Sequence, residues 1–271
     1  MTVPSGPTPP TPPPPVPAAS SPATPPTRPA PPPTPGALRL LYGLLLRAQI
    51  TRARVIALLA LGAVGILVGV ALGQSGRSDD AFHAARFIDD FGISLLVPVA
   101  SLVFASATLG DPNEDGTLVY LWLRPVARWK IVAAAALSSF TVTWPIVTLP
   151  LVVAGLAAGG GRDLVVGTLA GVTVAMVGYI GLFVALGLRV KRALIWGLLY
   201  IFIWEGFVAT ANTTAARLAV RSYGRSTLSA ISGADFGLTQ IAAPWRWVVP
   251  LGVALVALAY ATRRLARQDI A

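Results

Sequence analysis

Six long uncharged stretches alternate with short charged segments along the chain. Five of them contain no Asp, Glu, Lys or Arg, and the remaining one contains only Glu205. In chain order the stretches are Val55–Gly73, Phe91–Gly110, Ile131–Gly161, Leu164–Leu188, Ala193–Ala216 and Trp247–Thr262. A helix needs about 20 apolar residues to cross a bilayer, with a range of roughly 17–25, so five stretches are long enough and the last is slightly short.

This pattern predicts an all-α polytopic integral membrane protein with six transmembrane helices. A helix satisfies its backbone hydrogen bonds within one segment, as lipid requires. The apolar residues do not alternate with polar ones, which argues against a β-barrel. Composition agrees, because 55% of the residues are hydrophobic and 12% are charged, whereas soluble domains carry about 25% charged residues.

The first 36 residues differ from the rest of the chain. They contain 17 of the 24 prolines, and Arg28 is their only charged residue. Such a segment cannot bury a core and favours extended conformations, so we expect residues 1–36 to be a disordered Pro-rich cytoplasmic tail. PxxP spacing also allows docking of a Pro-recognising module, but that spacing is inevitable in so rich a tract. The membrane domain is then expected at 37–271.

Residues 37–54, ALRLLYGLLLRAQITRAR, combine leucines and arginines at helical spacing. Leu40, Leu41, Leu44 and Leu45 can share one face, and Arg47, Arg52 and Arg54 follow. This pattern is typical of an interfacial helix that lies on the inner leaflet before the first crossing. The alternative is that the segment extends the first transmembrane helix into the cytoplasm.

The distribution of basic residues predicts the orientation. With the N-terminus in the cytoplasm, 14 of the 21 Lys and Arg residues fall in inner segments, and six crossings place the C-terminus inside as well. This bias follows the positive-inside rule, so both termini are expected to be cytoplasmic. It also explains the net charge of +10 without nucleic acid, because the basic residues gather at helix ends rather than in a stripe with aromatics.

Several kinds of chemistry are excluded or disfavoured. The chain has no cysteine, which excludes disulfides, cysteine-ligated zinc and thiol nucleophiles. His83 is the only histidine, and we expect it to be a solvated loop residue rather than a ligand or base. No metal site is therefore predicted.

The stretch EDGTLVYLWLRPVAR, residues 114–128, interrupts this apolar sequence between the second and third runs. Thr117 can cap a short helix, and Pro125 turns the chain. The helix would present an apolar face made by Leu118, Leu121 and Trp122. Apolar residues on the cytoplasmic side suggest a surface for a partner protein or for the bilayer.

EDGTLVYLWLRPVARWKIV resembles the Glu-x-x-Gly-Thr-Leu…Leu…Arg/Ser-Pro-Val/Ile-x-Arg signature of ABC-2-type transporter permeases. The matching residues are Glu114 or Asp115, Gly116, Thr117, Leu118, Leu121, Pro125 and Arg128. The expected interfacial helix, six crossings and long loop before the last crossing also agree with that family, over residues 37–271. Arg124 departs from the small residue that many members carry, and the Pro-rich tail is not part of the family pattern.

The resemblance implies the membrane-spanning subunit of an ABC transporter of the exporter type, in the plasma (inner) membrane of a bacterium. Two copies, identical or paralogous, would pair, and each would dock an ABC ATPase subunit on its inner loops. The coupling element would comprise Glu114, Gly116, Thr117, Leu118, Leu121, Trp122, Pro125 and Arg128. Membrane lipids are the remaining expected partners.

We expect no catalytic centre in this chain. A GxxxxGK[ST] phosphate-binding loop is absent, and the only lysines, Lys130 and Lys191, do not follow the required glycines. ATP and Mg²⁺ would therefore be bound by the partner ATPase, and no cofactor is expected here.

Glu205 is the single charge inside an apolar run. Twelve residues at about 1.5 Å each place it roughly 18 Å into the fifth helix, just beyond the middle of a ~30 Å core. An acid at that depth costs on the order of 2.5–3.5 kcal/mol and must face protein or water. It is either a translocation-path residue or a structural acid bonded to Tyr200, Thr210 or a neighbouring helix.

Two other functions remain open. A self-contained secondary transporter or channel would use Glu205 as a proton or ion site, and a membrane scaffold would recruit partners through the Pro-rich tail.

The segment 212–246 is too long for a bare loop and is expected to form short helices at the outer face. Glycines at four-residue spacing, Gly65, Gly69 and Gly73 and also Gly167 and Gly171, predict close helix packing.

Overall fold

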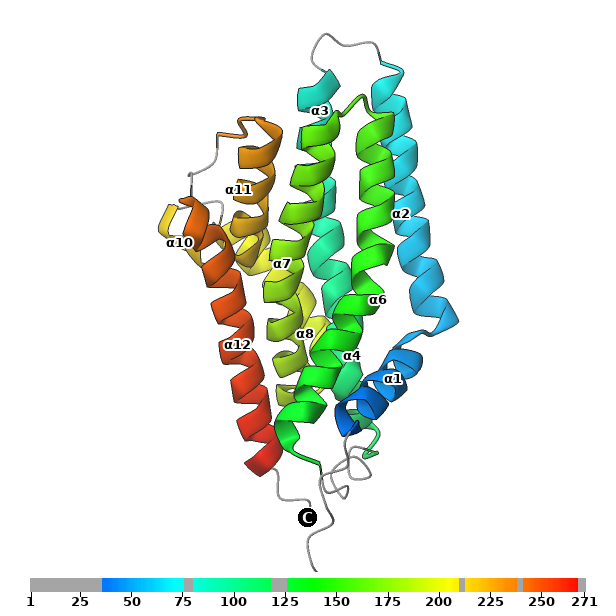
Figure 1. The fold of residues 1–271 in the computed structure, drawn as a ribbon, viewed down its shortest axis with the longest axis vertical. Coiled ribbons are helices and arrows are strands. Elements are labelled where there is room, and N and C mark those ends of the chain that lie inside the picture. Colours follow the sequence, from blue (N-terminus) through cyan, green and yellow to red (C-terminus); the bar gives the residue numbers. More distant parts are fainter. Residues whose placement is uncertain (1–35, 76–79, 118–125, 210–212, 238–240, 268–271) are drawn as a thin grey trace, which may run out of the picture. The chain divides into compact units, whose positions relative to one another are not determined.

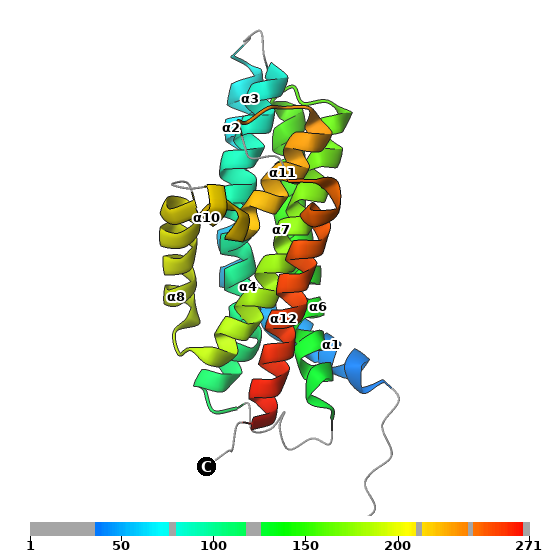
Figure 2. The same cartoon turned by 90° about the vertical axis from the view of Figure 1, so that its left-hand side faces the viewer.

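A computed structural model describes residues 36–75, 80–117, 126–209, 213–237 and 241–267, and these residues form helices joined by short connections (Figures 1 and 2). Two segments, η1 and η2, have the wider π-helical hydrogen bonding. The elements are α1 (Ala37–Gln49), α2 (Arg52–Gly73), α3 (Asp80–Phe87), η1 (Ile88–Leu96), α4 (Val97–Glu114), α6 (Arg128–Ala157), α7 (Arg162–Arg189), α8 (Ala193–Leu199), η2 (Tyr200–Val208), α10 (Thr213–Leu218), α11 (Val220–Ser232) and α12 (Ala243–Arg267).

Five helices of the described chain are long and apolar enough to cross a membrane. They are α2, the continuous helix Ala81–Glu114 that includes η1 and α4, α6, α7 and α12. The last uncharged run is slightly short, but the helix that contains it is not, because α12 extends beyond the run at both ends to 25 residues. Arg246 and Arg263 lie within this helix and flank its apolar part.

The stretch Ala193–Ala216 behaves differently from the expectation. Its first part forms α8 and η2, of seven and nine residues, and α10 begins separately at Thr213. Figure 2 shows α10 turning away from the direction of α8. A sixth full-length apolar helix is thus not present among the described residues.

α7 is the central helix, and it packs against α4, α6, α11 and α12. Its side chains Tyr179 and Phe183 are fully buried and stack with their ring centroids 5.7 Å apart. α2 lies outside this centre and packs chiefly on α6. The core therefore lies along α7, and α2 is the more peripheral helix.

Glycines allow the close approaches that their spacing predicts. A Cβ atom at Gly171 of α7 would lie 2.8 Å from the carbonyl oxygen of Gly224 in α11. Gly69 of α2 lies in the same way directly against the backbone of Ala154 in α6. A larger residue at either position would push two helices apart.

α1 is a separate amphipathic helix, because the chain leaves helical geometry at Ile50 and Thr51. Its buried residues Leu41, Leu45 and Gln49 face the bundle, whereas Leu40 and Leu44 are exposed, so the prediction that all four leucines share one face is wrong. The Gln49 amide donates a hydrogen bond of 2.8 Å to Ser138 of α6. The alternative of one continuous first helix is therefore wrong.

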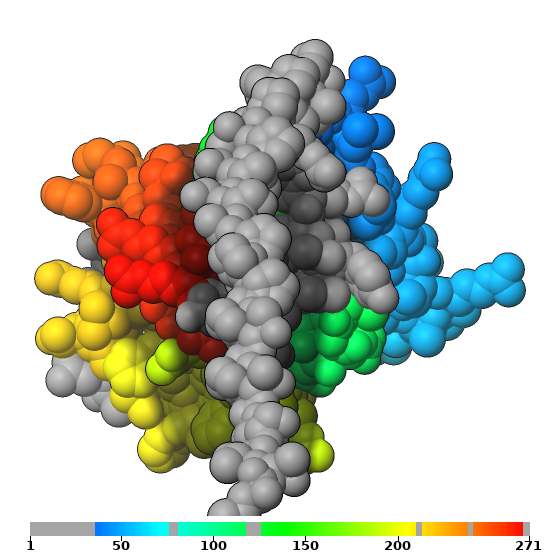
Figure 3. Space-filling view, turned by 90° about the horizontal axis from the view of Figure 1, so that it is seen from below, coloured from blue at the N-terminus to red at the C-terminus, as the bar shows by residue number. Residues whose placement is uncertain are grey.

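Most basic side chains belong to one end of the bundle, which we call the basic end. There α1 lies, α4 and α7 end, α6 and α8 begin and α12 ends (Figure 1). Figure 3 looks onto this end, with α12 in red on one side and α1 and α2 in blue on the other. Its described basic residues are Arg39, Arg47, Arg52, Arg54, Arg128, Lys130, Arg189, Lys191, Arg192, Arg263, Arg264 and Arg267.

Candidate functional site

The predicted coupling element begins at the basic end, where α4 finishes at Glu114. The Glu114 carboxylate accepts a hydrogen bond of 2.6 Å from the backbone N–H of Arg192. Arg192 has a left-handed φ of 59° and immediately precedes α8. The α4 end is thereby joined to the connection between α7 and α8.

The next residues turn the chain away from α4. Gly116 has φ 68°, a conformation that glycine adopts without steric cost. The Thr117 hydroxyl donates a hydrogen bond of 3.4 Å to the carbonyl of Pro112, so in the described residues it bonds backward to α4. The helix that Thr117 is predicted to cap lies outside the described residues. Arg128 begins α6.

The apolar part of the predicted coupling element lies outside the described residues. This applies to Leu118, Leu121, Trp122 and Pro125. Among the described residues that precede it in the chain, Asp111 of α4 forms an ion pair of 2.6 Å with Arg54 at the start of α2. The described flanks of the element are thus bonded to α2, α4 and the α7–α8 connection.

Glu205 lies in η2 and is 1% exposed, as expected for an acid that faces the bundle. Its carboxylate accepts a hydrogen bond from the Tyr179 hydroxyl of α7 and another of 3.0 Å from Tyr200. A third, of 3.1 Å, comes from the backbone N–H of Val220. Tyr200 and a neighbouring helix were the predicted partners of a structural acid, and Thr210 lies outside the described residues.

The bond to Val220 places Glu205 at the N-terminus of α11. The N-cap residue of α11 is Ala219, which has no side-chain acceptor for the free N–H groups of the first turn. Glu205 supplies that acceptor from another helix. An acidic residue is also the type that the positive end of the α11 dipole favours.

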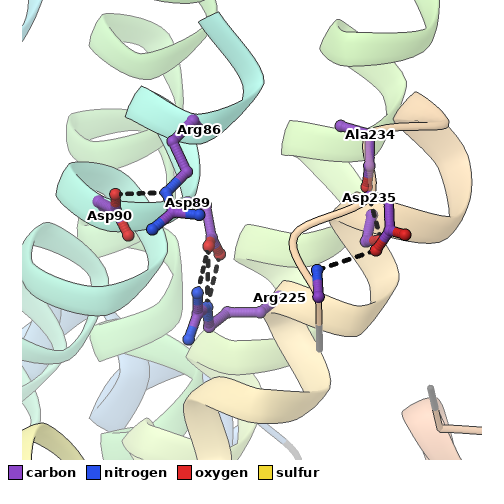
Figure 4. A network of polar contacts seen from close by, with 8 residues as sticks. Arg86, Asp89, Asp90, Arg225, Ala234 and Asp235 are labelled. Carbon is purple, nitrogen blue, oxygen red and sulfur yellow. Dashed lines mark hydrogen bonds and ion pairs between the residues drawn. The ribbon is translucent and has the colours of Figure 1, made fainter. Parts of the chain in front are cut away.

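A second buried acid, Asp89 in η1, contacts α11 at Arg225, about one turn beyond Val220. Asp89 is 0% exposed, and the Arg225 guanidinium donates to both of its carboxylate oxygens, with Nε at 2.7 and 2.9 Å (Figure 4). Bidentate pairs of this kind are short and directional. Arg86 bonds the neighbouring Asp90 at 2.9 Å in a more exposed position.

This pair was not predicted from the sequence. Asp89 lies two residues before the uncharged run that begins at Phe91, and Arg225 lies within the segment 212–246. An acid next to an apolar run was the available signal, but nothing in the sequence linked it to an arginine 136 residues later.

Arg221 lies in α11 between Val220, which contacts Glu205, and Arg225, which contacts Asp89. Its side chain is buried and forms no hydrogen bond or close ion pair with another described residue. Burial, followed by the nearby Arg225, lowers the pKa of Arg221, whereas Glu205 and Asp89 oppose that shift. Two acids and two arginines thus share one buried region around α11.

The segment expected as short helices at the outer face does fold into α10 and α11. α11 is more than a surface cap, because it packs along α7 and buries Tyr223 and Leu228. The described residues contain no group of three or more His, Asp or Glu side chains that could hold a metal ion. His83 is exposed as expected, but it lies in helix α3 rather than in a loop.

The sequence matches no protein-family model and no curated protein. Function must therefore be argued from the signature at the basic end, the helix arrangement and the two acids that hold α11.

Proposed function

We propose that this chain is the permease subunit of an ABC transporter of the ABC-2 type, most simply an exporter, driven by a separate ATPase subunit. The observation that carries the proposal is the position of the signature segment. Its described residues Glu114 and Gly116 lie at the basic end, and Glu114 is bonded to the connection before α8. A motor docked on this segment would therefore act on two connections at once.

The helix arrangement supports six crossings within this proposal. α2, α3–α4, α6, α7, α8–η2 and α12 run alternately away from and toward the basic end (Figure 1). At about 1.5 Å per residue, α8–η2 is roughly 24 Å long, which is less than a ~30 Å hydrocarbon core. The positive-inside rule favours a cytoplasmic basic end, hence cytoplasmic termini in the plasma membrane.

The partners follow from the same proposal. A second permease copy, identical or paralogous, would complete the translocation path, and ATP and Mg²⁺ would bind to the partner ATPase. The sequence of this chain has no phosphate-binding loop. Residues 1–36 would form a cytoplasmic tail, and residues 37–271 would form the membrane domain.

Site-specific photocrosslinking from position 121 in native membranes tests the proposal. We expect capture of a cytoplasmic protein that carries a GxxxxGK[ST] loop and hydrolyses ATP. A crosslinker at Ser75, which follows α2 at the opposite end, is the matched control and should not capture it. Capture of lipid alone from position 121 would contradict the proposal.

The second candidate is a self-contained secondary transporter or channel, which the buried Glu205 favours. Its carboxylate is bonded to Tyr179 and Tyr200, groups that can also exchange protons. Reconstitution of the chain alone in liposomes separates the two candidates. Transport driven by an ion gradient without ATP would favour the second.

A further inference from the structure

An apolar groove of about 900 Å³ lies between α7, α8 and α12. Its walls are mainly aliphatic and aromatic, and Arg189 is the one charged residue among the described residues that line it. The Arg189 side chain forms no ion pair with another described residue. A positive charge is therefore available at the rim of an apolar groove.

The lining changes in character along the groove. At the basic end it contains Arg189 from the end of α7, Trp196 from the start of α8 and Tyr260 from the last turns of α12. Farther from that end it contains Val248 and Gly252. Arginine and amphipathic aromatic rings are typical of headgroup depth, and aliphatic walls are typical of acyl-chain depth.

We propose that this groove binds one anionic phospholipid. The headgroup lies at Arg189, and an acyl chain lies along the aliphatic surfaces of α7 and α12. Charge complementarity favours an anionic lipid over a zwitterionic one, because Arg189 is the only charge that the described residues contribute to the lining. The alternative occupant is a helix of a second copy. Such a helix would give the Arg189 guanidinium an anionic partner only if it carried an acidic residue at that position.

Two features make the groove more than ordinary lipid-facing surface. A Cβ atom at Gly252 would meet no heavy atom within 4 Å, so this glycine leaves the wall hollow. Tyr200 lines the groove, and its hydroxyl donates a hydrogen bond to the Glu205 carboxylate. A bound lipid would therefore contact a residue of the network that holds α11.

Native mass spectrometry of the purified chain, released from vesicles of equal parts phosphatidylglycerol and phosphatidylcholine, tests the inference. We expect preferential retention of one phosphatidylglycerol. Arg189→Gln should reduce that retention about tenfold, as expected for loss of a charge-assisted hydrogen bond. Arg263→Gln, an exposed arginine of the same end that does not line the groove, should leave it unchanged.

Gly252→Leu should reduce the retention of both lipids, because the leucine side chain would occupy the groove. A Cβ atom at this position meets no heavy atom within 4 Å, and leucine favours helix more than glycine does, so the fold should be kept. Leu255→Phe adds volume to the exposed face of α12 outside the groove and serves as its control.

Equal retention of the two lipids by the unaltered chain would overturn the inference, and so would undiminished retention in Gly252→Leu. An equal loss in variants and controls would assign the signal to surrounding lipid and would also overturn it. The inference requires the basic end to face an anionic leaflet, but it does not require an ATPase. Its failure is therefore distinguishable from failure of the proposed function.

Discussion

Glu114 and Arg192 join two connections at the basic end, although 78 residues separate them in the sequence. The carboxylate of Glu114 lies 2.6 Å from the backbone nitrogen of Arg192, which has a left-handed φ of 59°. A residue other than glycine is uncommon in that conformation. The hydrogen bond therefore stabilises a turn that determines where α8 begins.

Replacement of Glu114 tests whether this contact transmits the action of a motor. Glu114→Ala should lower the free energy of unfolding by about 1 kcal/mol, because the acceptor is lost at a partly solvated position. It should also reduce substrate-stimulated ATPase activity of the reconstituted complex. Glu114→Gln retains an acceptor oxygen and should lie closer to the unaltered protein in both measurements. Identical behaviour of the Ala and Gln variants would contradict a role for the hydrogen bond.

The buried pair of Asp89 and Arg225 should contribute strongly to stability. Removal of one partner leaves an uncompensated buried charge, so Asp89→Ala or Arg225→Ala should cost about 3–5 kcal/mol. The double variant Asp89→Leu with Arg225→Leu should cost less than the sum of the single changes, because it leaves no unpaired charge. Unfolding in micelles, followed by circular dichroism, measures this difference.

The neighbouring pair of Arg86 and Asp90 provides the control for that experiment. Its side chains are 49% and 57% exposed, compared with 15% and 0% for Arg225 and Asp89. Exposed pairs contribute about 0–1 kcal/mol. Arg86→Ala should therefore change stability little, and a loss as large as that of Arg225→Ala would show that burial is not the cause.

The apolar runs predicted the helical class and the five long helices because a membrane helix depends on local composition. Run length was a poorer guide to helix length. α12 includes arginines beyond its uncharged run, whereas the run Ala193–Ala216 is divided between α8–η2 and α10. Charged residues at the ends of a helix do not end it, and uncharged residues do not by themselves keep a helix continuous.

The polar contacts around α11 could be predicted only in part. Glu205 was identifiable because a lone acid in an apolar run must face a partner. Its bond to the backbone of Val220 was not predictable, since any residue could supply that N–H. Asp89 and Arg225 meet only because α11 packs back along α7, and this tertiary arrangement has no local signal in the sequence.

Glu205 should tolerate replacement by glutamine. Glu205→Gln keeps an oxygen that can accept from Val220, so folding should be intact, and transport should change if the residue lies on the translocation path. Equal expression with unchanged transport and unchanged substrate-stimulated ATPase activity would assign Glu205 a structural role only.

Glu205→Ala tests that structural role directly. It leaves the first turn of α11 without its acceptor, and hydrogen exchange should then accelerate at residues 220–225. Tyr200→Phe removes one donor but retains the contact with Val220. It should leave exchange in α11 nearly unchanged.

Close helix packing at Gly171 should be sensitive to added volume. A leucine at this position would clash with the backbone of Gly224, and overpacking typically costs about 1–3 kcal/mol. Gly43→Leu in α1 is the matched control, because no heavy atom lies within 4 Å of a Cβ there. Thermal unfolding in detergent should separate the two variants, and equal melting temperatures would contradict close packing of α7 on α11.

The proposed topology is directly testable because the chain has no cysteine. Single cysteines at Ser75 and Asp235 should react with a membrane-impermeant maleimide in intact cells, since both residues lie away from the basic end. Single cysteines at Thr117 and Lys191 should react only after the membrane is opened. Lys191 precedes α8, and Asp235 follows α11. The two positions together therefore test whether α8–η2 crosses the membrane. Labelling of both from the same side would show that α8–η2 does not cross, and would remove the sixth crossing from the proposal.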